Sequence, residues 1–585
     1  MLRLSAKKSL LVVAPLLMLL ALLTGACQTR EKGRKPSPDW SRSVPVGVLL
    51  RGDIDMITGS QDEQLVHMVW LQQVGDQDLV HYVQLDSIAE SLVDRDLELP
   101  DGSLRYPRIA ETADQNLHLL WSSRSEEVRE WDLRYTQIDP AGNLVGDEKL
   151  LAPADQDINS YTIAPDDQGG IYVAWESKAD GGIHGARISS AGNMVQEPVL
   201  LARQGESPFL AADGSAVSLI WFDEGGMQYA RWPDGNLAES AGETVAEITL
   251  GTGQILDGPV MGIAGDWAYV LWSVYSSSGL EAGTAVAKYV AFPKEAPTKS
   301  DQNTIRMSSS EETPYEPFES AYQITRLAPP ADIRGSSGLV RQPSPAAAKE
   351  DELAVAVVVD QESRLDVITQ VGLLLFKDGE YAGYQMAGKT DAFSQEPVLS
   401  VDQDGNLYMA WREGGRGSVA YYALTEVEAR NALSRMTGGD IASTAMSGGM
   451  EVIAGMLFFP LACVWIFPAL LFIGLLHLWR GESELSQPLT IVAIVLAVII
   501  AEIVKLAFLP TISSYVPFSA WLDIPQRWDS TLRVLVPAVT LLIGLLAAMF
   551  VYRRNKSGLL FAFVLIGVDA LLTLAVYGVN FLGVF

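Results

Sequence analysis

The stretch Glu396-Pro397-Val398-Leu399-Ser400-Val401-Asp402-Gln403-Asp404-Gly405-Asn406-Leu407-Tyr408-Met409-Ala410-Trp411 decides the fold of most of this chain. It predicts a short strand, a polar turn and an apolar strand that ends in Trp. Similar phrases recur over the first three quarters of the sequence, which indicates a repeat architecture. The aligned last residues of the phrases are Trp70, Trp121, Trp175, Trp221, Trp272, Val357 and Trp411.

The spacing of the repeats predicts the number of units. The aligned residues follow one another at intervals of 51, 54, 46, 51, 85 and 54 positions. Short strands at this spacing, separated by turns rich in Gly and Asn and without a helical period, are typical of a propeller. The sequence therefore predicts an all-β seven-bladed β-propeller over residues 44–428. A second marker in phase supports it, since a proline stands 13 or 14 positions before the aligned residue at Pro107, Pro208, Pro259, Pro343 and Pro397.

The repeats resemble those of sialidase-like and related bacterial surface propellers over about residues 44–425. A sialidase requires an arginine cluster, a Tyr–Glu nucleophile pair and an acidic carboxylate. The stretch Tyr106-Pro107-Arg108-Ile109-Ala110 has letters similar to the first sialidase arginine motif, but in a different order. Asp402–Asn406 comes nearest to the Asp-box pattern, and we interpret it as a hairpin turn. The resemblance thus concerns the fold, and no catalytic constellation is recognised.

Two segments of the predicted propeller differ from the repeat. Residues 43–50 alternate apolar and polar side chains ahead of the first unit, so we expect them to supply the missing outer strand of the last blade. Residues 292–320 form an insertion rich in Ser, Glu, Thr and Pro, which predicts a mobile loop. It is either a tolerated surface insertion or a lid or partner-binding segment. The repeated Trp is interpreted as a wedge between neighbouring blades rather than as a sugar-stacking residue.

The N-terminus has the layout of a secretory signal. Basic residues precede an apolar run, and Thr24-Gly25-Ala26-Cys27 follows. This end resembles a bacterial lipoprotein lipobox, which implies lipid attachment at Cys27, although Thr24 departs from the usual pattern. The alternative is an uncleaved membrane anchor over residues 1–27. Residues 28–43 are expected to be a flexible tether near membrane lipid headgroups.

The C-terminal quarter predicts a membrane domain. After a small and polar linker at 429–450, residues 451–585 contain four apolar segments, each long enough to cross the bilayer as a helix. The basic run at 553–556 predicts a cytoplasmic loop, which places the propeller outside the cytoplasm of a bacterial cell. The four expected transmembrane helices are about 452–478, 489–509, 532–552 and 559–585.

Three ionisable residues fall inside the predicted spans. Glu502 and Lys505 are three positions apart on one helix face and are able to pair. Asp569 lies near the middle of the last span, where an unpaired charge is costly. These residues are candidates for an intramembrane functional site, or for a hydrogen bond that joins helices.

Composition excludes several classes of function. The formal net charge is −29, and residues 36–450 hold 28 basic and 63 acidic residues. Such an acidic domain repels phosphate backbones, so no nucleic-acid partner is expected. The propeller contains no Cys, and its His residues lack metal-motif spacing, so we expect neither metal nor cofactor.

The function predicted at this point is binding without catalysis. The chain is expected to be a membrane-anchored extracytoplasmic propeller that binds a carbohydrate or other surface ligand, or an envelope protein. The first alternative is a sialidase-like glycoside hydrolase, which requires carboxylates and arginines that converge at the axis of the propeller. The second alternative is a receptor or accessory subunit of a membrane sensor or transporter.

Overall fold

A computed structural model describes two parts of the chain and divides it into two compact units, Lys32–Arg435 and Met1–Glu31 with Met436–Phe585. In the first unit it describes residues 35–434 except 60–64, 76, 101, 126–127, 167–168, 280–281, 309–313, 332–336, 347, 363–366, 389, 391 and 415–417. In the second unit it describes residues 459–480, 485, 487–512 and 529–577.

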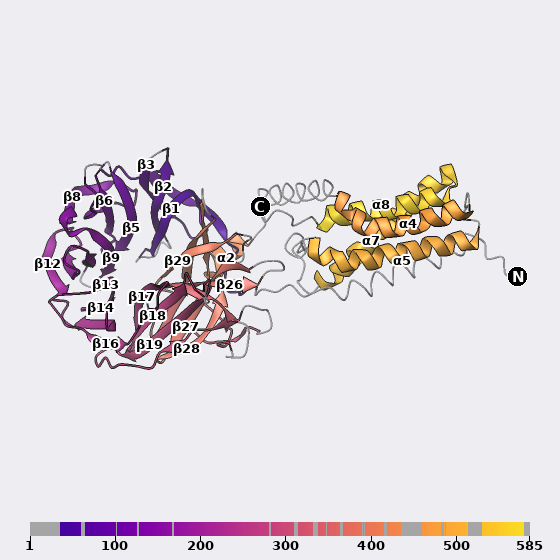
Figure 1. The fold of residues 1–585 in the computed structure, drawn as a ribbon. Helices are drawn as coiled ribbons and strands as arrows, with labels where there is room; N and C mark the ends of the chain where they lie inside the picture. Colours follow the sequence, from indigo (N-terminus) through magenta and orange to yellow (C-terminus); the bar gives the residue numbers. More distant parts are fainter. Residues whose placement is uncertain are drawn as a thin grey trace. The chain divides into compact units, whose positions relative to one another are not determined.

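The first unit is a β-propeller, in which small antiparallel sheets surround a common centre (Figure 1). Within the described residues, five sheets have four strands each, paired in chain order. Their strands are β5 (Ser103–Glu111), β6 (Leu117–Arg124), β7 (Asp132–Ile138), β8 (Leu144–Ala152); β9 (Ile158–Pro165), β10 (Ile171–Ser177), β11 (Ile183–Ile188), β12 (Met194–Ala202); β13 (Glu206–Asp213), β14 (Ala216–Asp223), β15 (Gly226–Trp232), β16 (Glu243–Ala246); β17 (Gln254–Ala264), β18 (Trp267–Ser276), β19 (Ala285–Pro293), β20 (Asn303–Thr304); and β25 (Val340–Pro345), β26 (Glu352–Glu362), β27 (Val367–Lys377), β28 (Glu380–Met386).

A larger sheet joins the two ends of the propeller sequence. Its strand order is β29-β30-β31-β1-β2-β3-β4, and β1 is shared between its two halves. Val44 at the start of β1 pairs with Tyr422 of β31, whereas Thr58 at its end pairs with Val66 of β2. The pairing of the first half of β1 with β31 confirms the prediction that residues 43–50 supply the missing outer strand of the last unit. The strands are β1 (Val44–Thr58), β2 (Val66–Val74), β3 (Gln77–Leu85), β4 (Ser91–Asp96), β29 (Ser394–Val401), β30 (Leu407–Glu413) and β31 (Ser418–Leu424).

The first strand of each sheet faces the centre. These innermost strands contact one another in ring order, and the last of them contacts the first again. Figure 1 shows several of them around the centre, with β8, β12 and β16 at the rim. Because all of the innermost strands run in the same sense along the axis, their starting ends meet at one end of the ring. The order is β1, β5, β9, β13, β17, β25, β29 and back to β1.

The repeated Trp side chains form the packing between neighbouring sheets. Each is at most 1% exposed and lies in an apolar cluster with residues of the adjacent sheet. The interpretation of these residues as scaffold is therefore confirmed. The buried Trp residues of the repeat are Trp70, Trp121, Trp175, Trp221, Trp272 and Trp411.

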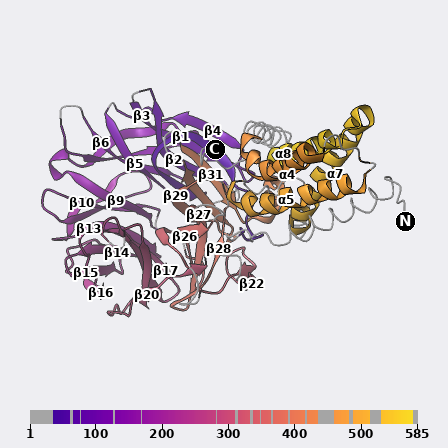
Figure 2. The ribbon, with the colours of Figure 1, turned by 45° about the vertical axis from the view of Figure 1, so that its right-hand side comes forward.

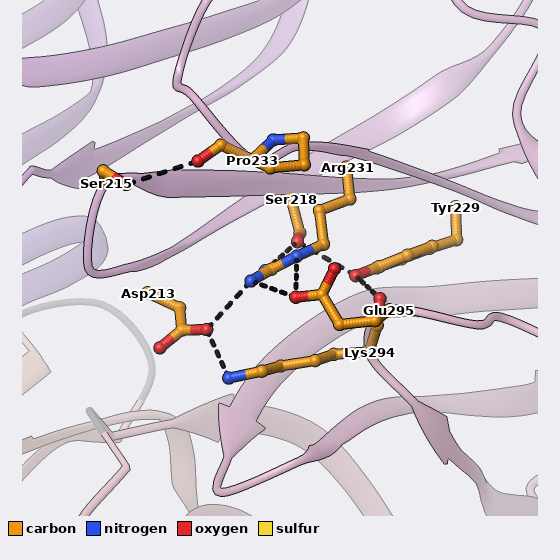
Figure 3. A network of polar contacts seen from close by, with 8 residues as sticks. All are labelled: Asp213, Ser215, Ser218, Tyr229, Arg231, Pro233, Lys294 and Glu295. Atoms are coloured by element: carbon orange, nitrogen blue, oxygen red, sulfur yellow. Dashed lines mark hydrogen bonds and ion pairs between the residues drawn. The ribbon is translucent and has the colours of Figure 1, made fainter.

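Polar side chains also join neighbouring sheets, at the end of the ring where the innermost strands finish (Figure 3). Lys294, which follows β19, places its Nζ 2.6 Å from Asp213 Oδ2 at the end of β13. Arg231 of β15 lies 3.1 Å from the same Asp213 oxygen and 3.0 Å from Glu295 Oε1. Although burial acts to raise the pKa of Asp213, Lys294 and Arg231 hold it below its ordinary value. The charges balance one another, so we assign this network to the scaffold.

The predicted flexible tether is wrong for its described residues, 35–43. Trp40 is buried, and its indole N–H donates to Gln385 Oε1 at 3.0 Å. The Asp39 carboxylate accepts from the backbone N–H of Thr325 at 2.9 Å and from Arg326 at 3.1 Å. This segment is fixed because it supplies an aromatic wedge and a carboxylate that the neighbouring backbone requires.

The predicted mobile loop at 292–320 is also wrong in its described part. β20 completes its sheet by pairing Asn303 with Tyr289. Ile305 and Met307 then pack into the core. The two residues are two positions apart on an extended segment, so both side chains point to the same, buried face. The many Ser and Glu residues around them make the segment polar on average, and this average does not reveal the two buried positions. Short strands follow at β21 (Met307–Ser308), β22 (Glu316–Pro317), β23 (Arg326–Leu327) and β24 (Ser337–Gly338).

The beginning of the predicted linker belongs to the first unit. Helix α2 (Val427–Leu433) buries Ala429 in the core, and Arg430 donates to the backbone carbonyl of Asp39 at 3.0 Å. The propeller unit therefore extends beyond residue 428. The rest of the linker lies outside the described residues.

The second unit is a bundle of apolar helices (Figure 2). Two of them contain segments long and apolar enough to cross a membrane, Pro488–Lys505 and Leu535–Asn555. The apolar segments Cys463–Trp479 and Gly558–Leu574 are shorter, so four complete spans remain a prediction. The described elements are a 3₁₀ turn (Phe459–Ala462), α4 (Cys463–Arg480), α5 (Pro488–Ile512), α7 (Asp529–Asn555) and α8 (Gly558–Tyr577).

We predict that closure of the ring is sensitive to one glycine of β1. A Cβ at Gly47 would lie 2.6 Å from the Trp70 ring, so Gly47→Ala forces the wedge or the strand to move. We expect a loss of about 1–3 kcal/mol in the free energy of unfolding, as is typical of overpacking. Thermal denaturation followed by circular dichroism measures the loss. The neighbouring Val48→Ala, at an exposed position, is the control, and equal melting of both variants would contradict the prediction.

Candidate functional site

The innermost strands share a distortion near their starting ends. The register of these strands with their partners is interrupted there, for example between Arg105 and Arg108 and between Gln395 and Val398. Such bulges redirect side chains and occur often beside active sites. In four strands the residue before the in-phase proline adopts a left-handed backbone, which costs about 1–3 kcal/mol for residues other than glycine. These residues, with φ between 50° and 53°, are Tyr106, Ser207, Gln342 and Glu396.

Glu396 is the most notable of the four. Its Oε1 lies 2.5 Å from Arg412 Nη2, and its backbone N–H donates to Gln342 Oε1 at 2.8 Å. Its Oε2 is buried, and no hydrogen-bond partner reaches it from the described residues. Burial and the negative charge of Asp53 raise the pKa of Glu396, while Arg412 and Arg108 oppose the rise. A carboxyl group with a raised pKa and one free oxygen is suited to proton donation.

A second carboxylate group lies close to Glu396. Asp53 of β1 forms an ion pair with Arg108 of β5, with 3.3 Å between Oδ2 and Nη2. The two side chains are 30% and 27% exposed, so neither is fully buried in the core. Although burial acts to lower it, the carboxylates of Asp55 and Asp53 raise the pKa of Arg108. Arg108 therefore remains charged and holds Asp53 beside Glu396.

Two further carboxylates position the strands. Asp55 Oδ2 accepts the backbone N–H of Ile109 at 2.8 Å, and burial raises the pKa of Asp55. Asp257 of β17 accepts the backbone N–H of Gln342 at 2.9 Å, and burial raises its pKa as well. The charge of Asp53 contributes to the rise at Asp257, so carboxylates from different sides of the ring act on one another. Side chains of β1, β5, β17, β25 and β29 thus converge at the axis.

Aromatic residues lie beside this centre. Tyr161 of β9 donates its hydroxyl to the backbone carbonyls of Arg105, at 3.1 Å, and Tyr106. Burial raises the pKa of Tyr161. Tyr106 is 40% exposed, and the Arg105 guanidinium lies 4.0 Å from the centre of the Trp131 ring. An exposed aromatic surface therefore borders the charged centre.

The residues singled out from the sequence occupy other places. Cys27 lies outside the described residues. Asp402–Asn406 is a hairpin turn, as interpreted, since Asp402 Oδ1 accepts the backbone N–H of Asn406 at 2.8 Å. Among the described residues, no group of three or more His, Cys, Asp or Glu side chains is arranged to hold a metal ion. The His residues of the propeller pair with aromatic or acidic side chains, as His67 does with Tyr82 and His81 with Asp96.

The three ionisable residues of the helical unit form one buried cluster. Lys505 Nζ of α5 lies 2.7 Å from Glu502 Oε1 and 2.8 Å from Asp569 Oδ2 of α8. Thr540 of α7 adds a hydrogen bond of 3.0 Å between its Oγ1 and Asp569 Oδ1. The cluster therefore connects three helices and contains two carboxyl groups for one ammonium group. The sequence indicated the pair Glu502–Lys505 but not the link to Asp569, which depends on how α5 and α8 pack.

The sequence reasoning missed the axial residues because it treated the repeat as uniform. The in-phase prolines were read as a fold marker, yet each stands directly after the bulge residue. That position varies from unit to unit: Tyr106, Ser207, Gly258, Gln342 and Glu396. Variation at a fixed place in a repeat was the signal that could have identified them.

Comparisons with known proteins give fold relatives but no family. No family model matches the chain, and no curated protein matches it. Among solved structures, an ulvan lyase of a polysaccharide lyase family has 8% identity and a TM-score of 0.41, covering 69% of this chain and 98% of its own. An α-L-arabinofuranosidase from Fusarium graminearum has 11% identity and a TM-score of 0.37, covering 66% and 98%. An endo-arabinase from Bacteroides thetaiotaomicron has 10% identity and a TM-score of 0.30, covering 66% and 98%.

The prediction of a binding protein without catalysis is corrected by these comparisons, because the similar structures are polysaccharide-cleaving enzymes. The prediction rested on the absence of a recognised motif. The axial carboxylates and arginines come from strands far apart in the sequence, so no local motif displays them. At this level of identity the likeness concerns the fold, and any chemistry of this chain has to be argued from its own side chains.

We predict that the buried cluster of the helical unit depends on its ammonium group. Lys505→Met leaves Glu502 and Asp569 without a counter-charge, which destabilises the unit by about 3–5 kcal/mol. Denaturation of the full chain in detergent, followed by helical circular dichroism, measures the loss. Lys556→Met at an exposed position is the control. Adding Glu502→Gln to Lys505→Met should recover part of the stability, and no difference between Lys505→Met and Lys556→Met would contradict the prediction.

Proposed function

We propose that this chain is a glycoside hydrolase whose active site lies at the axis of the propeller, at the starting ends of the innermost strands. The observation that carries the proposal is the pairing of Glu396, which has a raised pKa and a free oxygen, with the Arg-bound carboxylate of Asp53. Most glycoside hydrolases require two such carboxyl groups in different protonation states.

The two carboxyl groups have different roles in the proposed reaction. Glu396 donates its proton to the glycosidic oxygen as the bond to the anomeric carbon breaks. Asp53 carries the negative charge that faces the anomeric carbon, and it acts either as the nucleophile or as the base that takes a proton from water. Water supplies the new hydroxyl group, and the stereochemistry of the product distinguishes the two roles of Asp53.

The surrounding residues hold this arrangement. Gln342 accepts the backbone N–H of Glu396, and its own backbone N–H is bound by Asp257. These bonds fix the left-handed backbone of Glu396. Arg108 holds the Asp53 carboxylate in an ion pair, and Arg412 binds Oε1 of Glu396, whose Oε2 is buried without a hydrogen-bond partner among the described residues. Asp55 and Asp257 accept backbone N–H groups, which suits positioning residues rather than acids or bases.

We further infer that the propeller has seven blades and that the helical unit anchors it in the bacterial plasma membrane with the propeller outside the cytoplasm. The ring of contacts from β1 to β29 supports the blade count. Two long apolar helices and the basic residues Arg553 and Arg554 support the anchor and its orientation. Lipid attachment at Cys27 and four complete spans belong to the same proposal.

A second candidate function is that of a receptor or accessory subunit of a membrane sensor or transporter. The observation that favours it is the buried cluster of Glu502, Lys505 and Asp569, because charged residues within apolar helices often serve transport or signalling. In this case the cluster would be a functional site and the propeller its external domain. Loss of a transport or signalling response in Asp569→Asn, with cleavage of glycans unaffected, would favour this function.

We predict that removing either carboxyl group abolishes cleavage of glycans. Glu396→Gln and Asp53→Asn should each lower kcat by about 100-fold or more, because proton transfer and stabilisation of charge are lost. Release of reducing ends from a panel of neutral and acidic polysaccharides, with the full chain in detergent, measures the activity. Glu197→Gln on the outer strand β12 is the control. If wild type cleaves no glycan, or if both variants remain as active as the control, the proposed function is wrong.

We also predict a shift in the pH dependence of the reaction. Arg412 lowers the pKa of Glu396, so Arg412→Met raises it further and keeps the acid protonated to higher pH. The alkaline limb of kcat/KM should therefore move to higher pH. The pH profile of kcat/KM is measured for Arg412→Met and, as a control, for Arg203→Met, which replaces an exposed arginine. An alkaline limb that stays in place, or moves to lower pH, would exclude Glu396 as the acid.

A further inference from the structure

Two arginines at the start of β5 and the end of β6 lie against one indole ring. The guanidinium carbons of Arg105 and Arg124 lie 4.0 Å and 4.6 Å from the centre of the Trp131 ring. We propose that these residues, with Tyr106, form a subsite for a sugar that carries an anionic group, so that the substrate is an acidic polysaccharide. This inference rests on the proposed hydrolase function and names its substrate class.

Among the described residues, no carboxylate forms an ion pair with the two arginines of this subsite. Other arginines near the axis form ion pairs, as Arg108 does with Asp53 and Arg412 with Glu396. In the described part of the chain, no carboxylate lies within ion-pair distance of Arg105 or Arg124. Two neighbouring guanidinium groups that no described carboxylate neutralises suit a carboxylate or a sulfate, both of which match their planar donors.

The environment of Arg105 also favours binding of an anion. Burial lowers the pKa of Arg105, and the positive charge of Arg124 adds to this effect, whereas Asp157 opposes it at longer range. Arg105 donates to the backbone carbonyl of Ile158 and, at 3.4 Å, to Ser122 Oγ. Its guanidinium is therefore fixed beside a second positive charge, and a bound anion would relieve the repulsion between the two.

Tyr106, the exposed aromatic residue of the subsite, has an unfavourable backbone conformation. Tyr106 adopts a left-handed backbone with φ of 50° and is 40% exposed. Tyr161 fixes it by donating to its backbone carbonyl. The same backbone conformation occurs at Ser207, Gln342 and Glu396, so it belongs to the bulge of the repeat, and what is particular to Tyr106 is an exposed aromatic ring at this position. Its ring supplies an apolar face on which a sugar ring can lie while the anionic group meets the arginines.

The subsite is connected to the proposed catalytic centre. Tyr161 interacts electrostatically with Arg105 on one side and with Arg108 and Asp53 on the other. A polysaccharide that occupies the arginine subsite with one residue therefore presents a neighbouring linkage to the axis. The acidic character of the rest of the domain repels polyanions, so binding of an acidic glycan depends on the positive charges of Arg105 and Arg124.

Binding of defined oligosaccharides to the full chain in detergent tests the proposal. The probes are fluorescent oligogalacturonate, a sulfated galactan oligosaccharide and a neutral arabino-oligosaccharide, each measured by fluorescence anisotropy with Glu396→Gln to prevent cleavage. We expect at least one anionic probe to bind more tightly than the neutral probe. The better anionic probe distinguishes recognition of a carboxylate from that of a sulfate.

Replacing the arginines of the subsite then distinguishes binding at this site from attraction to any positive charge of the protein. Arg124→Gln and Arg105→Gln should weaken binding of the anionic probe by about 10-fold or more, as expected for a lost charged hydrogen bond. Arg203→Gln, which removes one exposed arginine elsewhere, should leave it unchanged. Melting temperatures show which variants are folded, and Arg124→Gln, at a partly exposed position, carries the test if Arg105→Gln does not fold.

The outcomes distinguish this inference from the proposed function. If wild type cleaves neutral glycans and the arginine variants change nothing, the acidic substrate class is wrong while the hydrolase proposal stands. If the anionic probe binds through Arg124 but wild type cleaves no glycan of the panel, the subsite is supported and the hydrolase proposal fails. Equal binding of all three probes overturns the inference.

Discussion

The architecture of the propeller depends on the double pairing of β1. The first half of this strand completes the sheet of β29–β31, and its second half begins the sheet of β2–β4. The same strand carries Asp53 and Asp55 at the point where it changes partner. Ring closure therefore places Asp53 of the first unit beside Glu396 of the last. If β1 did not close the ring, the two carboxyl groups would lie at opposite ends of an open chain of sheets.

The fold of the propeller was predictable because its signals are local and repeated. The buried Trp at the end of each second strand and the alternation at 43–50 both follow from which side chains a sheet must cover. The path of segments that fill gaps was not predictable. Residues 35–43 and 303–308 are mostly polar, yet they insert apolar side chains such as Trp40 and Met307 into the core. Residues 427–433, most of which were expected to belong to a linker, insert Ala429.

The axial site was beyond sequence reasoning for a different reason. Its side chains come from one position in each of several units, and their meaning arises only when the ring brings those positions together. The recurrent prolines marked the place, but the residues before them looked like ordinary loop residues. The ion pair of the helical unit was unpredictable for the same reason. Asp569 and Lys505 are far apart in the sequence, and they meet only because α5 packs against α8.

In the proposed reaction, Glu396 and Asp53 face the reacting sugar. Covalent labelling with epoxyalkyl glycosides, which react with carboxyl groups inside a glycosidase site, followed by peptide mass spectrometry, tests it most directly. We expect the label on Glu396 or Asp53, and we expect an excess of cleavable glycan to prevent labelling. A label on carboxyl groups away from the axis, or labelling that no glycan prevents, would show that Glu396 and Asp53 do not form the active site.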